Sequence, residues 1–586
     1  MAALKIENLI TDHLDLWSAA VRPKSSAGRG SNSKLELTGI KKLRELILEL
    51  AVRGKLVPQD PNDEPASVLL ERIAVEKARL VKEKKIKKEK PLSAISEDEK
   101  LFELPNGWEW CRLSELGVFF GGKTPSKMKS DYWGGDIPWV TPKDMKVDYI
   151  IESEDYVTDI AVDDGLTLVK PNSLLFVARS GILRRKFPVA ITTVTCTVNQ
   201  DLKVLQPFDC GLAPYIHLMM KGFEKYILKN LTKVGTTVES LVFDEFSINP
   251  FILPPLFEQH RIVAKVGELM ALCDQLEQRS ESQSAAHQTL VETLLATLTD
   301  SSDADELVQN WARLSTHFDT LFTTEASIDA LKQTILQLAV MGKLVPQDPS
   351  DEPASVLLER IAAEKAQLVK EGKIKKQKPQ SVLTEEEKAF ELPNGWKWVR
   401  LQQLVTLLGD GLHGTPSYDE NGDYFFVNGN NLDNGRIIIK PDTKRVNKLE
   451  FEKYKKNLTD RTILVSINGS LGKVGFYAGE KIVLGKSACY FNLSDLLSKV
   501  YFKRVIESSY FTDYAFSKAT GSTIKNLGLK AMNEFPIALP PIEEMKRIIS
   551  RVEQLIALCD QLKVRLQTSQ QTQLALAESL VEGALA

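Results

Sequence analysis

The sequence has few of the residues that usually build metal sites and disulfide frameworks. It contains six cysteines and six histidines, and no two cysteines form a CxxC pair. A zinc site needs closely spaced thiol or imidazole ligands, and a disulfide framework needs many paired cysteines. The histidines are dispersed, and no His/Asp/Glu cluster has metal-ligand spacing. We therefore predict a protein without a bound metal and without a disulfide scaffold.

Long apolar runs are also absent. A transmembrane helix needs about 20 consecutive apolar residues, and no run in this sequence approaches that length. The first residues, Met1–Asn8, lack the basic region and apolar core of a signal peptide. These absences favour a cytoplasmic protein that does not contact a membrane.

Familiar catalytic motifs are missing as well. The sequence has no HExxH or GxSxG motif, and no Asn/Asp-Pro-Pro-aromatic motif of the kind that amino-methyltransferases use. Gly479–Ser487 is similar to a phosphate-binding loop, but five residues separate its glycines, where that loop has about four. We interpret this segment as a hairpin. We predict that the chain is not an enzyme on its own, has no catalytic residue and binds no cofactor.

Net charge gives no global sign of a nucleic-acid partner, because its formal value is −3. The basic residues are nevertheless unevenly distributed. Between Trp396 and Ala538 there are 20 lysines and arginines against 14 acidic residues, which gives +6. Between Trp108 and Ile252 there are 16 against 18, which gives −2. A DNA-binding hypothesis must therefore rest on where basic residues lie rather than on their total.

The most informative feature of the sequence is an internal duplication. Gly54–Ile73 and Gly342–Ile361 differ by one substitution and lie 288 residues apart. Three further pairs of segments repeat at offsets of 288, 286 and 286: Phe102–Trp108 with Phe390–Trp396, Leu253–Pro255 with Leu539–Pro541, and Ala271–Leu276 with Ala557–Leu562. Near-identical framing segments therefore surround two interiors of similar length but different sequence.

The framing segments have the periodicity of helices. In the first copy we predict a helix over residues 1–21, with a loop rich in Ser and Gly after it. A second helix is predicted from Thr38, as N-cap, to about Gly54. A third runs from Ala66 to about Lys88 and ends in a lysine-rich run.

After each interior, apolar residues step by 4, 3, 4 and 3, which is a heptad seam. The seam residues are Ile262, Val266, Leu269, Cys273 and Leu276 in the first copy, and Ile548, Val552, Leu555, Cys559, Leu562 and Leu566 in the second. The same spacing continues at Leu290, Leu294 and Leu298, and at Leu576 and Leu580. Two matching seams in one chain favour pairing of the two copies within the molecule.

The two interiors have a different texture. Short β-branched and aromatic runs alternate with Gly, Pro, Asn and Asp, which is typical of a strand-rich domain. The first interior also contains a helical insertion from Pro214 to Asn230. We therefore predict an α+β fold, in which two strand-rich mixed globular domains are joined by long helices in an internal pseudo-twofold repeat.

Loops rich in Gly, Thr, Asn and basic residues recur at corresponding places in the two interiors. Two of these pairs are Gly121–Pro125 with Gly411–Pro416, and Val177–Ile182 with Val465–Ser470 at an offset of 288. Glycine lets the backbone approach a ligand, lysine and hydroxyl groups suit phosphate oxygens, and Arg, Asn, Gln and His can recognise base edges. Any one of these loops is better explained as a simple turn. Four loops in register, however, favour a shared binding face.

The predicted DNA-binding residues follow from this loop chemistry. In the first interior they are Lys123, Thr124, Lys143, Arg179, Ser180, Arg184, Arg185, Lys186, Lys233, Thr236 and Thr237. In the second interior they are His413, Thr415, Asn428, Asn430, Asn431, Asn468, Ser470, Lys473, Lys486, Ser522 and Thr523.

Each interior has the same motif at its entrance and the same motif at its exit. Leu-Pro-Asn-Gly-Trp-x-Trp occupies Leu104–Trp110 and Leu392–Trp398, and Leu-Pro-Pro-x-x-Glu occupies Leu253–Glu258 and Leu539–Glu544. This paired arrangement resembles the specificity subunit of type I restriction-modification enzymes. The resemblance covers nearly the whole chain.

The resemblance implies that each interior is a target recognition domain for one half of a bipartite, asymmetric DNA site. It also implies that the long helices pair as an antiparallel spacer and dock two methyltransferase (modification) subunits, which restriction/translocase subunits join. S-adenosylmethionine, ATP and Mg would then bind to those partner subunits and not to this chain. Recognition residues are not fixed by motif in this family, so the residues named above rest on loop chemistry alone.

The expected organisation has five segments. They are an N-terminal helical frame (1–107), target recognition domain 1 (108–253), a central helical spacer with the second frame (254–395), target recognition domain 2 (396–539), and a C-terminal spacer helix (540–586) that pairs with the central one.

Two other classes of function remain open at this point. A fused single-chain restriction or modification enzyme is disfavoured by the missing methyltransferase and P-loop motifs. A coiled-coil scaffold whose variable domains bind peptide or glycan is the other alternative. Retention on immobilised DNA that falls steeply with salt would separate DNA binding from the scaffold.

Overall fold

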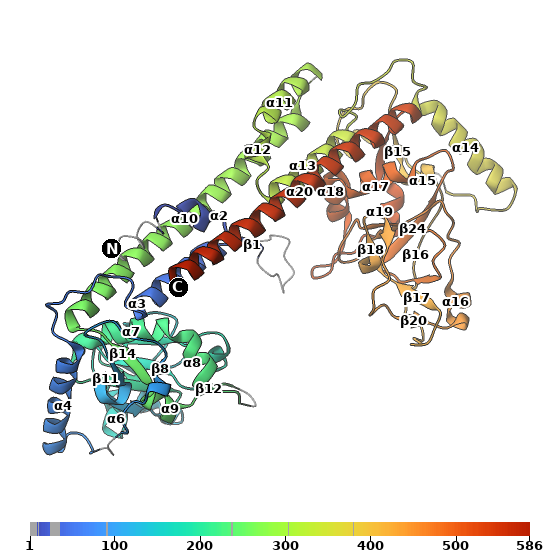
Figure 1. Cartoon of the computed structure of the whole chain (residues 1–586). Helices are drawn as coiled ribbons and strands as arrows, with labels where there is room; N and C mark the ends of the chain where they lie inside the picture. Colours follow the sequence, from blue (N-terminus) through green and yellow to red (C-terminus); the bar gives the residue numbers. More distant parts are fainter. Residues whose placement is uncertain are drawn as a thin grey trace. The chain divides into compact units, whose positions relative to one another are not determined.

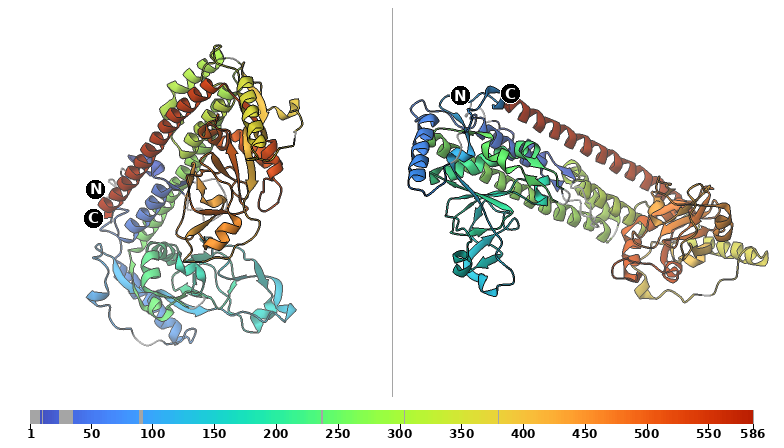
Figure 2. Two further views of the ribbon diagram at one scale, coloured as in Figure 1. Left: turned by 90° about the vertical axis from the view of Figure 1, so that its right-hand side faces the viewer. Right: turned by 90° about the horizontal axis from the view of Figure 1, so that it is seen from below.

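The computed structural model describes residues 9, 11–23, 35–88, 92–235, 238–302, 304–378 and 380–585. The chain forms two compact units, one of residues 1–283 and 569–586 and the other of residues 284–568. Each unit contains a framing segment, a strand-rich domain and part of both long helices. These helices are α10 (Leu256–Asp300) and α20 (Ile542–Leu585), green and red in Figures 1 and 2.

In its described residues, the frame of the first unit contains three helices and a short β-ladder: α2 (Leu14–Ala19), β1 (Arg22–Pro23), β2 (Leu35–Glu36), α3 (Thr38–Val52) and α4 (Ala66–Lys82). The apolar face of α3 lies at the centre of the core, with Leu43 and Ile47 fully buried. The predicted second helix is confirmed, although Thr38 is its first residue and Leu37 is its N-cap. Of the predicted first helix, residues 1–8 and 10 lie outside the described residues.

The frame of the second unit repeats this arrangement in the helices α11 (Ala304–Thr316), α12 (Phe318–Leu321), α13 (Glu325–Val340) and α14 (Ala354–Lys370). Contacts along α13 fix the direction of the long helices within this unit. Gln567 Nε2 donates to Glu325 Oε1 at 2.8 Å, and Lys332 Nζ donates to Asp560 Oδ1 at 2.5 Å. Because residue numbers rise along α13 while those of its partners fall along α20, the two helices run in opposite directions.

The other long helix, α10, runs in the same direction as α13. His287 meets the carbonyl oxygen of Thr320, before α13 begins, at 3.2 Å. Lys343, just after α13 ends, donates to the carbonyl oxygen of Thr299 at 2.8 Å. Within this unit α10 and α20 are therefore antiparallel, and both contribute to one hydrophobic core.

The predicted seams are buried. Ile262, Val266, Leu269, Cys273 and Leu276 are all at most 8% exposed and belong to the core of the first unit. Ile548, Val552, Leu555 and Cys559 are similarly buried in the core of the second unit, and Leu562 and Leu566 are half-buried against it. The heptad pattern therefore identified the packing face of each helix.

The predicted continuation of each seam is wrong in part. Leu290 and Leu576 are 50% and 52% exposed, whereas the buried residues are Val291, Leu295 and Leu298 in α10, and Leu574 and Ala577 in α20. An α-helix drifts by about 20° per heptad relative to a strict seven-residue repeat. Over the four heptads from Ile262 to Leu290 this drift reaches about 80°, which brings the next residue onto the buried face.

The first domain contains a five-stranded sheet in the order β4-β11-β8-β9-β6 and a three-stranded sheet in the order β10-β5-β7. The strands are β3 (Glu109–Arg112), β4 (Gly117–Gly121), β5 (Trp133–Val140), β6 (Tyr149–Ile150), β7 (Asp155–Val157), β8 (Leu174–Val177), β9 (Val189–Thr192), β10 (Thr197–Val198), β11 (Leu202–Pro207), β12 (Thr232–Lys233), β13 (Ser240–Leu241) and β14 (Pro250–Leu253). Its helices are α5 (Leu113–Leu116), α6 (Asp159–Asp163), α7 (Ala213–Gly222), α8 (Glu224–Asn230) and α9 (Phe243–Ile248).

The second domain repeats this topology, with sheets in the orders β16-β24-β21-β22 and β20-β17-β23. Its strands are β15 (Lys397–Arg400), β16 (Val405–Asp410), β17 (Tyr424–Val427), β18 (Leu432–Asp433), β19 (Arg436–Ile437), β20 (Arg445–Val446), β21 (Thr462–Ser466), β22 (Val474–Phe476), β23 (Ile482–Leu484), β24 (Ala488–Leu493) and β25 (Pro536–Leu539). Its helices are α15 (Leu401–Leu404), α16 (Lys448–Tyr454), α17 (Lys499–Glu507), α18 (Ser509–Lys518) and α19 (Leu529–Glu534).

In each domain the entrance and exit motifs pair with each other. Strand β3 pairs antiparallel with β14, and β15 pairs antiparallel with β25 in the same way. A parallel pair, β5 with β10 and β17 with β23, occurs in both domains. The α+β prediction and the internal repeat are therefore confirmed at the level of strand order.

Two local predictions are wrong. The third helix ends at Lys82 instead of near Lys88, and Lys84 has a left-handed φ of 57° that stops the helix. The like charges of the lysine run also disfavour a continued helix. Gly479–Ser487 is not a hairpin, because β23 pairs with β17 and β24 pairs with β16 and β21, in a different sheet.

Candidate nucleic-acid interface

In the first domain, four loops meet at one edge of the five-stranded sheet. They follow β4, follow β8, precede β11 and connect β12 with β13. Backbone hydrogen bonds hold them together: Lys123 N donates to Val198 O at 3.1 Å, Ala178 N to Asp201 O at 2.8 Å, and Ser180 N to Glu239 O at 3.1 Å. We call these loops the recognition loops of the first domain.

The second domain brings the corresponding loops together. They follow β16, follow β21, precede β24 and form the tight loop from Thr520 to Asn526. The connecting bonds run from Gly411 N to Ala488 O (3.2 Å), from Ile467 N to Ser487 O (2.9 Å) and from Gly469 N to Lys525 O (3.0 Å). These are the recognition loops of the second domain.

The hydrogen bonds show which residues correspond in the loops after β8 and β21. Leu241 N donates to Ala178 O, and Leu527 N donates to Ile467 O, both at 2.8 Å. The next residues, Arg179 and Asn468, each form an isolated β-bridge with the neighbouring loop. Arg179 therefore corresponds to Asn468 at an offset of 289. The offset of 288 predicted for this loop is wrong by one residue, because the sequence match ends before the loop begins.

A second correspondence joins the loops before β11 and β24. Asn199 N donates to Val140 O at 3.0 Å, and Gly485 N donates to Val427 O at 2.8 Å. The residues that follow are Gln200 and Lys486, and both are exposed. Gln200 also accepts a hydrogen bond from Thr124, so it lies within the recognition loops. The sequence analysis missed Gln200, although the repeat offset of 286 from Lys486 would have found it.

Most of the predicted residues of the first domain are exposed: Lys123, Thr124, Lys143, Arg179, Arg184, Arg185, Lys186 and Lys233. Ser180 is half-buried and accepts a hydrogen bond from Ile182 N. Lys143 Nζ lies 3.6 Å from Oε2 of Glu154. Thr236 and Thr237 lie outside the described residues.

Arg184 has a specific partner in the same loops. Its guanidinium pairs with the carboxylate of Glu239, which is only 4% exposed. The hydrogen bond from Arg184 lowers the pKa of Glu239, so this carboxylate stays ionised. Arg184 is thereby held against the recognition loops while its side chain remains largely exposed.

In the second domain the exposed predicted residues are His413, Thr415, Asn430, Ser470, Lys473, Lys486, Ser522 and Thr523. The imidazole of His413 pairs with the carboxylate of Asp410, and Lys473 Nζ lies 4.0 Å from Oδ1 of Asp433. Asn468 and Asn428 are half-buried, and they bond to Asn526 and Ser487 respectively.

Asn431 differs from the other predicted residues because it is only 4% exposed. Its side-chain oxygen accepts from Asn428 N at 3.0 Å, and its amide donates to Ile438 O at 2.9 Å. In the first domain Asp144 accepts from Thr141 N at 2.8 Å in the corresponding turn. Asn431 therefore supports a loop in the way that Asp144 does.

Two regions of the chain match one family model. Residues 105–283 and 393–569 both match the type I restriction modification DNA specificity domain. Two relatives from Escherichia coli match over the whole length. The EcoEI specificity subunit is 44% identical and the EcoAI specificity subunit 42% identical, each over 99% of this chain and 100% of the relative. The chain belongs to the type I restriction-modification specificity subunits.

A solved structure of a specificity subunit from Thermoanaerobacter tengcongensis is also similar to this chain. It is 16% identical, covers 83% of this chain and 98% of its own, and has a TM-score of 0.39. Specificity subunits determine the DNA sequence on which a type I system acts, and catalysis belongs to partner subunits. The predicted non-catalytic role is therefore confirmed by the family.

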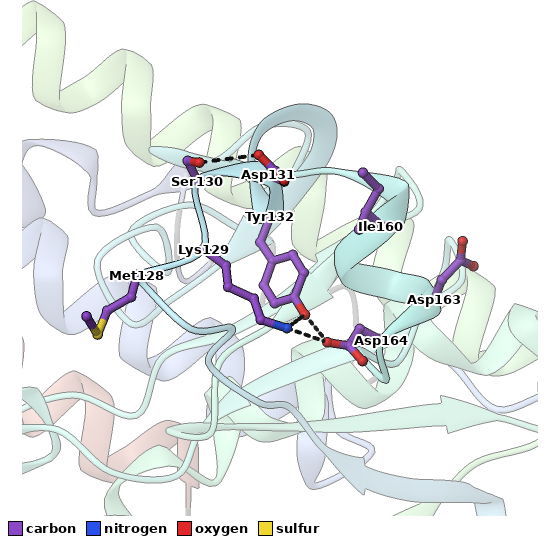
Figure 3. A pocket seen from close by; sticks show the side chains of 8 residues that line it. All are labelled: Met128, Lys129, Ser130, Asp131, Tyr132, Ile160, Asp163 and Asp164. Carbon is purple, nitrogen blue, oxygen red and sulfur yellow. Dashed lines mark hydrogen bonds and ion pairs between the residues drawn. The ribbon is translucent and has the colours of Figure 1, made fainter.

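The specificity subunit also has a hollow in the first domain, lined in part by the loop that follows β4 (Figure 3). It is lined by Met128, Lys129, Ser130, Asp131, Tyr132, Ile160, Asp163 and Asp164. Lys129 Nζ lies 3.2 Å from Asp164 Oδ2, and the hydroxyl of Tyr132 bonds to the same carboxylate. Lys129 and Asp164 therefore compensate each other's charge within the hollow.

Two general observations complete the description of this specificity subunit. In the described part of the chain, no group of three or more His, Cys, Asp or Glu side chains could hold a metal ion. None of the helices described is both long and apolar enough to cross a membrane.

Proposed function

We propose that this specificity subunit recognises a bipartite, asymmetric DNA site, with residues 108–253 recognising one half and residues 396–539 the other. The observation that carries this proposal is the pair of recognition-loop clusters. Several of their backbone hydrogen bonds correspond, but the side chains at corresponding places differ: Arg179 and Asn468, and Gln200 and Lys486. Arginine favours guanine and asparagine favours adenine. One scaffold with different side chains is suited to two different half-sites.

We place the direct contacts on the exposed predicted residues of the recognition loops, on the half-buried Asn468 and on Gln200. Lys123, Lys233 and Lys486 suit phosphate oxygens, because lysine is a flexible point charge. Arg179 and Asn468 are suited to base edges. Asn431 is left out of the contact set because its side chain is committed to its own loop.

The remaining parts of the complex follow from the family. We propose that the framing segments and spacer helices (1–107, 254–395 and 540–586) dock two modification subunits, which restriction/translocase subunits join. S-adenosylmethionine, ATP and Mg would bind to those subunits. The complex would act in the cytoplasm. The chain alone should neither methylate nor cleave DNA.

Exchange of one domain tests the proposal. Residues 108–253 are replaced by the matching segment of a relative, and methylated sites are mapped for the complex assembled with its modification subunits. We expect one half-site to change and the other to stay. The matched control is the same exchange of residues 396–539, which should change the opposite half-site. If both half-sites changed in either exchange, independent recognition by the two domains would be excluded.

A further inference from the structure

A lysine-rich segment follows α4 and α14 in the two copies (Figure 1). Lys82–Lys90 contains six lysines and two glutamates, and Lys370–Lys378 contains five lysines and one glutamate, so each has a net charge of +4. The described lysines are all exposed: Lys82, Lys84, Lys85, Lys87 and Lys88, and Lys370, Lys373, Lys375, Lys376 and Lys378. We call these segments the lysine turns. They lie within the framing segments, to which the proposed function gives no contact with DNA.

The two lysine turns differ in sequence but not in charge. Lys84 corresponds to Gly372, which removes a positive charge, and Glu89 corresponds to Gln377, which removes a negative charge. The two differences cancel. Lys84 also occupies a left-handed backbone position, with φ of 57°, where Gly372 has φ of 70°. Such a backbone costs a residue with a side chain more than it costs glycine.

In the part of each lysine turn that the structure describes, a backbone hydrogen bond ties the turn to the helix before it. Lys85 N donates to Leu80 O, and Lys373 N donates to Leu368 O, both at 2.9 Å. A half-buried lysine of the preceding helix supports the second turn, because Lys365 Nζ donates to Gln377 Oε1 at 2.8 Å and to the domain at Gln402 O at 2.7 Å. The exposed lysines are therefore presented at a defined place.

The helix before the first lysine turn is held to its domain in a similar way. Lys77 Nζ donates to the carbonyl oxygen of Ser114, in α5, at 3.0 Å. Helices α5 and α15 lie at the start of β4 and β16. The recognition loops follow the opposite ends of these two strands. The lysine turns are therefore separate from the recognition loops.

The charge of the lysine turns is mostly uncompensated. One lysine in each turn has an acidic partner within the turn, since Lys85 lies 2.8 Å from Glu83 and Lys373 lies 2.8 Å from Glu371. The structure describes eight other lysines in residues 82–88 and 370–378, and none of these eight takes part in an ion pair that it describes. A cluster of unpaired positive charge attracts a polyanion.

We propose that each lysine turn binds phosphate groups of duplex DNA without regard to sequence. Lysine contributes charge to phosphate binding but carries little base specificity. The two lysine turns have the same net charge, although the recognition loops of the two domains differ. An equal charge suits a contact with the DNA backbone, because the backbone is the same at every sequence. The inference rests on the DNA-binding role of the family and not on which residues of the recognition loops contact bases.

The test uses the complex of the full chain with its modification subunits and measures binding to duplexes with and without the target site over a range of NaCl concentrations. One variant changes Lys375, Lys376 and Lys378 to Gln. We expect affinity for both duplexes to fall by the same factor. Removing three phosphate-binding lysines should reduce the slope of log affinity against log salt by about 2.7, at about 0.9 per phosphate.

A matched control changes Lys170, Lys229 and Lys397, three exposed lysines outside the lysine turns, to Gln. This control removes the same net charge and should leave the slope within about 0.5 of the parent, because these lysines are not expected to bind phosphate. Unfolding temperatures should be unchanged in both variants, since all six side chains are exposed.

Several outcomes would overturn the proposal. The slope could be unchanged in the turn variant, or it could fall equally in the control. Alternatively, the turn variant could fail to assemble with the modification subunits while the salt slope stays the same, which would make the turn a protein contact. Loss of discrimination between the two duplexes, with an unchanged slope, would also contradict the proposal. Arg179→Ala measured in parallel should reduce discrimination alone, which separates this test from that of the recognition loops.

Discussion

The indole Nε1 of Trp108 donates a hydrogen bond to Oε2 of Glu258 at 3.0 Å, and the pair is buried. Trp396 and Glu544 form the same bond at 3.0 Å in the second copy. Each bond joins the entrance motif of a domain to the first turn of the long helix at its exit. It explains why Asn-Gly-Trp and Leu-Pro-Pro-x-x-Glu occur together twice, because each motif supplies one partner of a buried pair.

The tryptophan of this pair should matter for stability. Trp108→Phe keeps most of the buried ring but leaves the carboxylate of Glu258 without its indole donor. An unsatisfied buried polar group costs about 1–3 kcal/mol, so the free energy of unfolding of the first unit should fall by about that amount. Denaturant unfolding, followed by a probe in the first domain, measures the change.

Trp110→Phe is the matched control for Trp108→Phe. Trp110 is half-buried and packs beside Phe102, with ring centroids 5.4 Å apart. This variant should destabilise the protein less, because most of the aromatic packing remains. Equal destabilisation in the two variants would show that the hydrogen bond to Glu258 contributes nothing.

The glutamate of the pair should make stability depend on pH. Burial raises the pKa of Glu258 above its ordinary value of 4.5. A carboxyl whose pKa is raised by folding contributes stability below its ordinary pKa, and this contribution is lost as the pH rises through the raised pKa. Glu258→Gln can still accept the indole hydrogen bond but does not titrate. The unfolding temperature of the variant relative to the parent should therefore increase from pH 4.5 to neutral pH.

The control for this titration is Glu109→Gln, which changes an exposed carboxyl of the same domain. Its unfolding temperature should follow that of the parent over the same pH range. Burial also raises the pKa of Glu544, so Glu544→Gln should repeat the behaviour of Glu258→Gln in the second unit. A difference between Glu258→Gln and the parent that does not change with pH would rule out this account.

Arg179 and Asn468 should each determine one base of one half-site. Replacing a base-reading side chain with alanine costs about 1–3 kcal/mol and relaxes one position. Arg179→Ala should therefore relax one position in the half-site of the first domain, and Asn468→Ala one position in the other. Competition between duplexes substituted at single positions measures both effects. A uniform loss of affinity for every duplex would assign the residue to phosphate binding instead.

The two long helices should set the gap between the half-sites. Both helices continue across the boundary between the two units, at residues 283/284 and 568/569. Seven residues inserted there in both helices add about 10 Å, at ~1.5 Å per residue, which is about three base pairs at ~3.4 Å each. The packing face turns by only about 20°. Methylation mapping should show a wider gap with unchanged half-sites.

Some affinity should be lost in this double insertion, because three base pairs rotate the DNA by about 100° at ~10.5 base pairs per turn. Insertion into α10 alone is the control. It should disrupt assembly, since the two antiparallel helices would no longer match in length. An active double-insertion complex that keeps the original gap would show that the long helices do not set the gap between the half-sites.

The duplication, the helical frames and the paired motifs can be predicted from the sequence alone. These features are local or periodic, so they survive in a one-dimensional pattern. The seam from Ile262 to Leu276 was predictable because spacing along one helix defines its buried face. Beyond Leu276 the pattern failed at Leu290, because a strict heptad ignores the drift of a 3.6-residue helix. The positive φ of Lys84, which ends the third helix early, was also not predicted, because no sequence pattern marks a lysine with a left-handed backbone.

Which loop residues belong together depends on the folded arrangement of distant segments. Arg179 corresponds to Asn468, and Gln200 to Lys486, through backbone hydrogen bonds to segments that are distant in sequence. Asn431 looked like a base-reading residue in the sequence, but its amide is used within its own loop. The chemistry of a side chain is visible in a sequence. Whether that side chain is free to bind DNA depends on the partners that folding brings to it.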